Sequence, residues 1–137
     1  MPTYCDASVL VAATWAQHTR HTAAFDWIDC LPPGEGHTGS HALLEAFAVL
    51  TAAAKVSPDR AMKALKSIAC DLQVHSLPAG EVWPLLAGCQ RAGVMGGGIY
   101  DWQHIQVARA AGCRRWATYN PSDFARHARA GEEIFQP

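Results

Sequence analysis

The sequence predicts an α/β fold with a mostly parallel central sheet of four to five strands and helices on both faces. Short apolar or β-branched segments alternate with longer segments of helical periodicity along the whole chain. The helical segments are long enough to connect parallel strands by crossovers. Half of the 137 residues are hydrophobic, so a single domain spanning residues 1–137 can bury roughly two-thirds of the surface of its unfolded chain.

The first half of the chain contains two predicted strands and four predicted helices. In order, they are strand 2–5, helix 7–16, helix 22–31, a short strand at 37–38, helix 41–54 and helix 57–72. Pro32 ends the second helix. Ser40 is a favourable N-cap for the helix that follows it, and Ser57 before Pro58 marks the start of the next one.

The second half continues this alternation. In order, we expect strand 73–77, helix 78–91, a glycine-rich loop at 93–98, helix 99–112, strand 113–119, a turn into a short helix at 120–124 and a last strand at 132–137. The glycine-rich loop has neither the lysine nor the spacing of a phosphate-binding P-loop. A flexible loop on the substrate side is therefore the better interpretation of these glycines.

Charge and cysteine usage exclude several classes of protein. The 11 basic and 12 acidic residues give a net charge of −1, which does not indicate a generally basic nucleic-acid-binding protein, although a local patch can still bind phosphate. The five cysteines and seven histidines are scattered, without C-x-x-C or H-x-x-x-H spacing, which argues against a disulfide framework and a zinc knuckle. No segment has the pattern of a secretory leader or a membrane span, so we expect a cytoplasmic protein that does not bind membranes.

Several polar residues follow the predicted strands, at the points where those strands end. Asp6 directly follows the first strand, and Asn120 and Asp123 follow the strand 113–119. Asp101 stands in the first turn of the helix after the glycine-rich loop. Ligands of open parallel sheets bind at the carboxyl ends of the strands, so this is where a site is expected.

Each acidic residue also has an ordinary structural explanation. Asp101 and Asp123 stand where a carboxylate stabilises a helix N-terminus by about 0.3–1 kcal/mol. Glu45 lies inside the helix 41–54, where a single carboxylate is commonly solvated. Asp6 is harder to explain in this way, because the residues on both sides of it are expected to be buried.

A bound cation would explain the acids together. Two carboxylates about 4 Å apart repel each other by roughly 4 kcal/mol at an effective dielectric constant of 20. If the acids converge, a hard divalent cation such as Mg²⁺ or Mn²⁺ makes the cluster tolerable, because such ions are commonly held by a few carboxylates. The spacing along the chain does not by itself show that they converge.

Four motifs in a fixed order indicate a family. They are Y-C-D-A-S-V-L at 4–10, H-A-L-L-E at 41–45, G-G-G-I-Y-D-W-Q-H at 96–104 and A-T-Y-N-P-S-D-F at 117–124. With these motifs the chain resembles the PIN-domain ribonucleases, especially the VapC-type toxins of bacterial toxin–antitoxin pairs. The resemblance extends through nearly the whole chain and implies a PIN-like three-layer α/β/α sandwich.

The resemblance also implies an active site. Asp6, Glu45 and Asp101 would be the catalytic acids, and Asp6, Asp101 and Asp123 would hold Mg²⁺ or Mn²⁺. The implied activity is the hydrolysis of RNA phosphodiester bonds by a metal-dependent endoribonuclease, in which Glu45 orients or deprotonates the attacking water. For Asp123, capping of the short helix is an equally weighted alternative.

Three polar residues would support these acids. Ser8 resembles the family's hydroxyl near the metal, and Thr118 resembles the threonine that closes its fourth strand. The alternatives are an ordinary residue at a helix N-terminus for Ser8 and a residue of high β-propensity for Thr118. Asn120 stands where many members have an aspartate, so the pocket would carry one negative charge fewer.

The resemblance further implies an RNA substrate, a cognate antitoxin protein and a homodimer. Arg109, Arg115 and His104 are the predicted substrate-binding residues, although arginines on helix surfaces are commonly just solvated. Two other functions stay open. One is a PIN-like module that binds RNA or protein with little catalysis, which Asn120 favours, and the other is a receiver-like phosphotransfer domain that uses Asp6.

Overall fold

Five short strands form one sheet in the computed structural model, which describes all residues 1–137. The strands are β1 (Thr3–Cys5), β2 (Gly36–Gly39), β3 (Gln73–His75), β4 (Arg115–Ala117) and β5 (Glu133–Phe135). Their spatial order is β3-β2-β1-β4-β5, and every neighbouring pair is parallel. The predicted parallel sheet is therefore confirmed.

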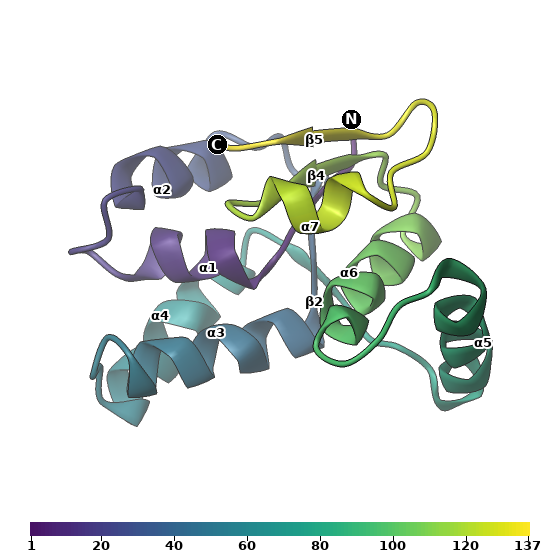
Figure 1. Cartoon of the computed structure of the whole chain (residues 1–137). Coiled ribbons are helices and arrows are strands. Elements are labelled where there is room, and N and C mark those ends of the chain that lie inside the picture. The colour runs from purple at the N-terminus through teal and green to yellow at the C-terminus, as the bar shows by residue number, and fades with distance from the viewer.

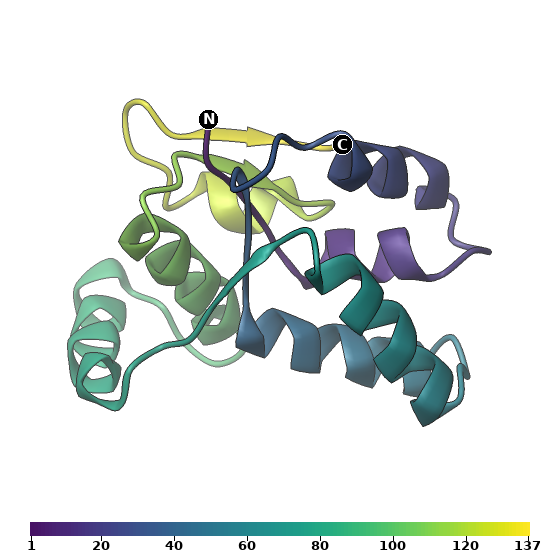
Figure 2. The same cartoon turned by 180° about the vertical axis from the view of Figure 1, so that it is seen from behind.

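Helices cover both faces of this sheet, which makes the molecule a three-layer α/β/α sandwich (Figures 1 and 2). The helices are α1 (Ala7–Thr14), α2 (His21–Asp29), α3 (Ser40–Ala52), α4 (Pro58–Ala69), the 3₁₀ turn η1 (Ala79–Glu81), α5 (Val82–Ala92), α6 (Gly98–Ala110) and α7 (Pro121–Ala125). α1 to α4 pack together on one face, α6 and α7 lie on the other, and α5 packs outside α6. Because all strands are parallel, their carboxyl ends share one edge of the sheet.

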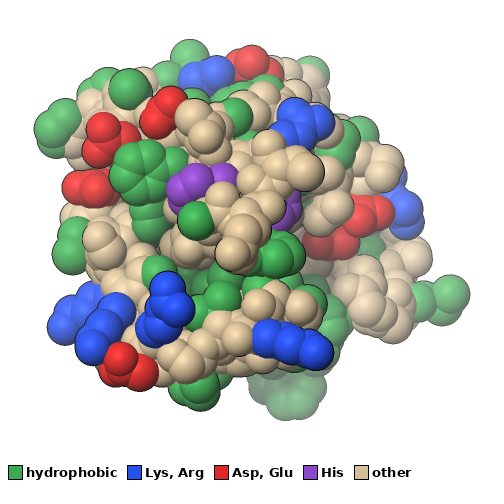
Figure 3. Space-filling model, turned by 90° about the vertical axis from the view of Figure 1, so that its left-hand side faces the viewer, with side chains coloured by type: hydrophobic (Ala, Val, Ile, Leu, Met, Phe, Trp, Pro, Cys, Tyr) green, Lys and Arg blue, Asp and Glu red, His purple; other side chains and the backbone are tan.

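The surface carries charges of both signs. Figure 3 shows the side of the molecule that is at the left of Figure 1, where Lys and Arg side chains are spread out and interleaved with Asp and Glu. This distribution agrees with the net charge of −1. None of the helices is both long enough and apolar enough to span a membrane.

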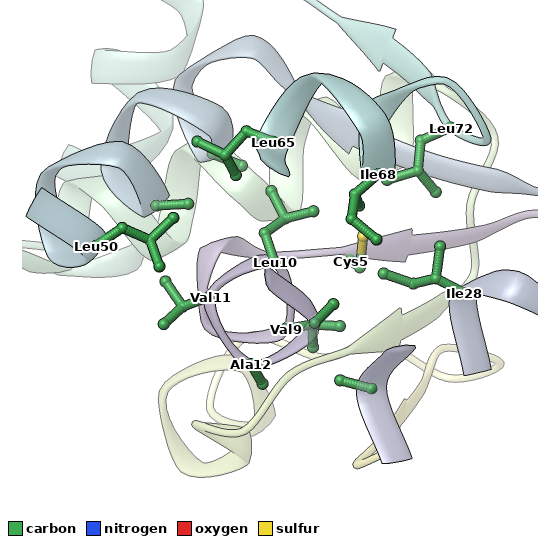
Figure 4. Packing of buried hydrophobic residues seen from close by; sticks show 14 of the residues in the cluster. Cys5, Val9, Leu10, Val11, Ala12, Ile28, Leu50, Leu65, Ile68 and Leu72 are labelled. Carbon is green, nitrogen blue, oxygen red and sulfur yellow. The ribbon is translucent and has the colours of Figure 1, made fainter. Parts of the chain in front are cut away.

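Two hydrophobic cores lie on opposite faces of the sheet. The larger one contains 16 buried residues, among them Cys5 of β1 and Leu10 of α1 (Figure 4). The smaller one contains Tyr4 and Trp116 together with residues of α6 and α7. Tyr4 and Cys5 enter different cores because successive side chains of a strand point to opposite faces. Burial on both faces fixes the register of β1 and with it the position of Asp6, the next residue.

Helix α3 begins one residue earlier than expected. The predicted N-cap Ser40 is its first residue, and Gly39 is the N-cap, without a side-chain hydrogen bond. Residue 39 has room only for glycine, because a Cβ atom there would lie 2.4 Å from the ring of His41 and 2.8 Å from Tyr4 Oη. Gly39 also ends β2, so the strand continues directly into the helix.

Candidate active site

Asp6 lies between the end of β1 and the start of α1, and only 4% of its surface is exposed. Its Oδ1 accepts hydrogen bonds from the Val9 N–H at 3.2 Å, which caps α1, and from Ser8 Oγ at 2.5 Å. Its Oδ2 accepts a hydrogen bond from Thr118 Oγ1 at 2.6 Å. A carboxylate offers about four acceptor positions, so Asp6 keeps one position for a further partner. Asp6 therefore caps a helix and is also a candidate ligand.

Burial raises the pKa of the Asp6 carboxyl above its ordinary value. The charge on His104 and the hydrogen bonds from Ser8, Thr118 and the Val9 N–H act in the opposite direction, because they stabilise the ionised form. A carboxylate in this position is stabilised further by any nearby cation. The pocket around Asp6 thus favours a positive charge beside it.

The hydroxyls of Ser8 and Thr118 connect Asp6 to the chain that follows β4. Ser8 Oγ accepts a hydrogen bond from the Tyr119 N–H at 2.9 Å, and Thr118 Oγ1 accepts one from the Asn120 N–H at 2.9 Å. Each hydroxyl therefore accepts from the backbone and donates to Asp6, which fixes the orientation of the carboxylate. The Asn120 residue is exposed, and its side chain makes no capping hydrogen bond to α7.

Three more carboxylates lie near this end of the sheet. Glu45 comes from α3, Asp101 from the first turn of α6 and Asp123 from the first turn of α7. Burial raises the pKa of Asp101, and the charges of Asp123, Asp6 and Glu45 raise it further, whereas His104 lowers it. The charges of the other three predicted acids therefore act on Asp101, although the four residues come from four different elements.

Two of these acids are open to solvent. The exposed fraction of the side chain is 46% for Asp123 and 36% for Glu45. The Arg126 guanidinium lies 3.7 Å from Asp123 Oδ1 and is itself 66% exposed. Asp123 and Glu45 therefore face solvent, with the Arg126 guanidinium beside Asp123, whereas Asp6 is buried.

His41 opens the H-A-L-L-E motif but is not one of the predicted site residues, and it lies beside Glu45 and His104. His41 Nε2 is 3.0 Å from His104 Nδ1, which is also 2.8 Å from Tyr4 Oη. His104 Nε2 is 3.2 Å from Glu45 Oε2. One ligand atom from each of His41, Glu45 and His104 lies within 4.8 Å of the other two. We call these three residues the His–Glu cluster.

The histidines have no H-x-x-x-H spacing in the sequence, yet the fold brings two of them beside a glutamate in this cluster. His41 and Glu45 are four residues apart on α3 and so share one face of the helix, while His104 comes from α6. The available signal was an H-x-x-x-E pattern, in which an acid takes the place of the second histidine. Burial and the charge of His104 lower the pKa of His41 to about 4, although Glu45 acts in the opposite direction. The His41 ring is therefore neutral at neutral pH.

The predicted substrate-binding residues are not free at the pocket. Arg109 is 13% exposed and donates two hydrogen bonds to the Glu132 carboxylate, at 2.7 and 2.9 Å. Arg115 is the first residue of β4, at the end of the strand away from the acids, and it donates to Glu133 at 2.9 Å. His104 is 2% exposed and serves the His–Glu cluster. The structure thus gives the predicted substrate role of these three residues no support.

A cavity of about 1040 Å³ lies apart from the acids, between α6 and the segment that contains α5. Its lining includes Leu77, Leu85, Arg91 and Trp102. Trp102 is buried and donates from Nε1 to the carbonyl oxygen of Leu85 at 3.2 Å. This tryptophan therefore packs α5 against α6.

The donor set of the acidic pocket fits a hard divalent cation. Asp6, Asp101, Asp123 and Glu45 offer only carboxylate oxygens, which are the ligands that Mg²⁺ and Mn²⁺ prefer. Burial is the main cause of the raised pKa of Asp101, and the charges of Asp123, Asp6 and Glu45 add to it; a nearby cation would oppose both effects. The residues present are thus suited to Mg²⁺ or Mn²⁺.

Comparison with known proteins agrees with this geometry. A family model described as PIN domain matches residues 3–130. The structure of VapC20 from Mycobacterium tuberculosis, described as a Sarcin-Ricin loop cleaving toxin, has 18% identity and a TM-score of 0.76, covering 98% of this chain and 99% of that one.

Two toxin–antitoxin structures are also similar. VapBC2 from Rickettsia felis, bound to a DNA fragment from its promoter, has 14% identity and a TM-score of 0.68, covering 100% of this chain and 99% of that one. VapBC-1 from nontypeable Haemophilus influenzae has 12% identity and a TM-score of 0.66, covering 99% of this chain and 98% of that one. A comparison with curated protein sequences found no significant match. At these identities the solved structures show a shared fold.

Proposed function

The chain belongs to the PIN domain family, and from this premise we propose that it is a Mg²⁺- or Mn²⁺-dependent endoribonuclease, the toxin of a bacterial toxin–antitoxin pair. The proposal is supported by the buried Asp6 at the carboxyl end of β1 and by Asp101, on which the charges of Asp123, Asp6 and Glu45 act. We place the activity in the cytoplasm, where such toxins meet RNA.

The acids have different roles in this proposal. Asp6 and Asp101 hold the ion, with Asp123 as a further ligand on the open side. A bound Mg²⁺ or Mn²⁺ supplies charge neutralisation at the scissile phosphate and lowers the pKa of water. Glu45 orients the attacking water or takes its proton, because it is partly exposed and its Oε2 is held by His104 at 3.2 Å.

Ser8 and Thr118 act on the ion through Asp6. Their hydroxyls donate to its two oxygens, at 2.5 and 2.6 Å, and so hold one carboxylate orientation. Asn120 contributes its backbone N–H to Thr118. Its exposed side chain adds a neutral amide at the pocket, so the site carries one charge fewer than an aspartate would give.

We propose that an RNA loop is the substrate and that Arg126 at the rim of the pocket binds its phosphates, in place of Arg109 and Arg115. The similar VapC20 is described as cleaving the Sarcin-Ricin loop. The similar VapBC structures contain an antitoxin, so we also propose a cognate antitoxin and a homodimer. Large apolar side chains that remain exposed on the chain, such as Leu44 at 73%, Trp83 at 74% and Met95 at 85%, are available for these contacts.

A binding module with little catalysis is the second candidate, because Asn120 lowers the charge of the pocket. A phosphotransfer domain is disfavoured, because the chain has no lysine after Lys66 and therefore none after a late strand.

Cleavage of RNA by the purified protein tests the proposal. We expect cleavage with Mg²⁺ or Mn²⁺, none with EDTA, and none for Asp6→Asn or Asp101→Asn. The matched control is Asp59→Asn, because Asp59 is exposed on α4 and pairs only with Lys63. RNA binding without cleavage by the wild-type protein would favour the binding module instead, and unchanged cleavage by Asp6→Asn would refute the assigned site.

A further inference from the structure

The His–Glu cluster has a donor set that differs from that of the acidic pocket. It offers two imidazole nitrogens and one carboxylate oxygen, all within 4.8 Å of one another. Imidazole is a favoured ligand of Zn²⁺ and of other late first-row metals, whereas Mg²⁺ prefers oxygen. Two histidines with one glutamate also form a known ligand set of zinc enzymes, in which water takes the fourth position.

The distances are close to those that an ion would require. Two ligand atoms bound tetrahedrally to Zn²⁺ stand roughly 3.3 Å apart, given bonds of about 2.0–2.1 Å. His104 can offer one ion only one of its two ring nitrogens, either Nδ1, which is 3.0 Å from His41 Nε2, or Nε2, which is 3.2 Å from Glu45 Oε2. With one ligand atom taken from each residue, all three atoms lie within 4.8 Å of one another. Side-chain rotations that shorten the longer separations would therefore place three donors around one ion.

The protein holds these side chains in place before any ion arrives. His104 is 2% exposed, and Tyr4 Oη lies 2.8 Å from its Nδ1. The His41 ring occupies space that exists only because residue 39 is glycine, since a Cβ there would come within 2.4 Å of the ring. His41 Nδ1 is buried without a hydrogen-bond partner, so hydrogen bonding alone does not account for this ring.

We infer that His41, Glu45 and His104 form a second metal site, selective for Zn²⁺ and similar transition-metal ions over Mg²⁺. The site differs in donor chemistry from the carboxylates Asp6, Asp101 and Asp123, because it contains two histidines. Glu45 belongs to both groups. Its existence does not depend on RNA cleavage, because it follows from the ligand geometry alone. The rival explanation is a purely structural hydrogen-bond network of Tyr4, His104 and Glu45.

Co²⁺ is the probe for this site, because its visible absorption reports coordination. The metal-free protein without a polyhistidine tag is titrated with Co²⁺ in excess Mg²⁺, which fills the acidic pocket. We expect one equivalent of Co²⁺ to bind with the intense visible bands of a four- or five-coordinate site, without a thiolate charge-transfer band in the near ultraviolet. Zn²⁺ should bleach these bands, and more Mg²⁺ should not.

Variants identify the ligands. We expect His41→Asn to weaken Co²⁺ binding at least about 100-fold, and Glu45→Gln to weaken it as well. The matched control is His75→Asn, which removes a histidine from the separate pair formed by His37 and His75 and should bind Co²⁺ like the wild type. Circular dichroism tests whether each variant is folded. If His41→Asn does not fold, Glu45→Gln alone tests the site.

Three results would overturn the inference. They are Co²⁺ binding that survives both His41→Asn and Glu45→Gln, binding that Mg²⁺ abolishes, and a spectrum with thiolate bands. Because Co²⁺ binding is read without RNA, a protein that cleaves no RNA can still confirm the site, and an active nuclease can still refute it.

Discussion

Thr118 Oγ1 donates a hydrogen bond of 2.6 Å to Asp6 Oδ2, across 112 residues of sequence. The bond joins the end of β4 to the cap of α1, because Thr118 follows one strand and Asp6 the other. Both side chains are buried, so neither can exchange this partner for water. The stability of the fold and the orientation of the proposed ligand therefore depend on the same contact.

Thr118→Val should impair stability and activity together. The substitution keeps the shape of the side chain but removes the donor, leaving Asp6 Oδ2 buried without this partner. We expect a loss of about 1–3 kcal/mol in the free energy of unfolding, measured by urea denaturation. Metal-dependent cleavage should fall about 10–100-fold, because the carboxylate is no longer oriented.

Thr51→Val is the control for this prediction. Thr51 Oγ1 donates to the Phe47 carbonyl within α3 and has no contact with the acids. It should change cleavage little. Equal losses of activity in the two valine variants would contradict the positioning role of Thr118.

Asn120→Asp should strengthen the binding of divalent cations. The new carboxylate adds a negative charge next to the acids. Without an ion this charge repels the other carboxylates, and with a divalent cation it adds attraction for the ion. We expect a lower melting temperature in EDTA than for the wild type, and a larger rise on addition of Mn²⁺, both measured by calorimetry. A rise no larger than that of the wild type would show that residue 120 does not face the ion.

Stability should fall as the pH drops below about 6.5, in part because of His37. Burial, and then the charge of His75, whose Nε2 lies 2.8 Å from His37 Nδ1, lower the pKa of His37 below its ordinary value. The folded protein therefore binds fewer protons here than the unfolded chain does. The stabilisation is complete at pH values above the pKa of His37 in the unfolded chain. It is lost as the pH falls toward the lower pKa of His37 in the folded protein.

His37→Gln should make this dependence shallower, because it removes the titrating group. Urea denaturation at several pH values between about 5 and 7.5 measures the slope. His18→Gln, which removes a histidine without contact to His37, should keep the wild-type slope. A slope that is the same in all three proteins would exclude His37 as a cause.

Replacing Arg109 should lower the free energy of unfolding much more than replacing Arg126. Arg109→Ala leaves Glu132, which is 9% exposed, without its bidentate partner, so we expect a loss of about 3–5 kcal/mol in the free energy of unfolding. Arg126→Ala removes a 66% exposed side chain, so stability should change by less than about 0.5 kcal/mol.

RNA binding should follow the opposite order. Arg126→Ala should weaken the affinity for RNA, measured by fluorescence anisotropy with a variant that cannot cleave, and should reduce its salt dependence. A stable Arg109→Ala variant with weak RNA binding would instead restore the role that the sequence indicates for Arg109.

The features that were predictable from sequence are those set by neighbouring residues. The apolar strand before Asp6 and the helical pattern after it place this carboxylate at the edge of the sheet. The position of Asp101 in the first turn of a helix was predictable in the same way, from the residues around it. The approach of His41 to His104 depends on how α3 packs near α6, which no local pattern reports. Arg109 shows the opposite error, in which the sequence predicts a substrate role for a residue that is engaged elsewhere. Its ion pair with Glu132 forms only because the chain returns to this region just before β5.

The direct passage from β2 into α3 at Gly39 sets a limit on how the length of this chain can vary. One residue inserted between Gly39 and Ser40 would turn α3 by about 100° relative to the sheet and carry Glu45 and His41 away from Asp6. Extra residues in the loop 93–97 would leave that frame untouched, because this loop lies between α5 and α6 and outside the passage from β2 into α3. Homologues should therefore vary in length before α6 and keep a constant length between β2 and α3.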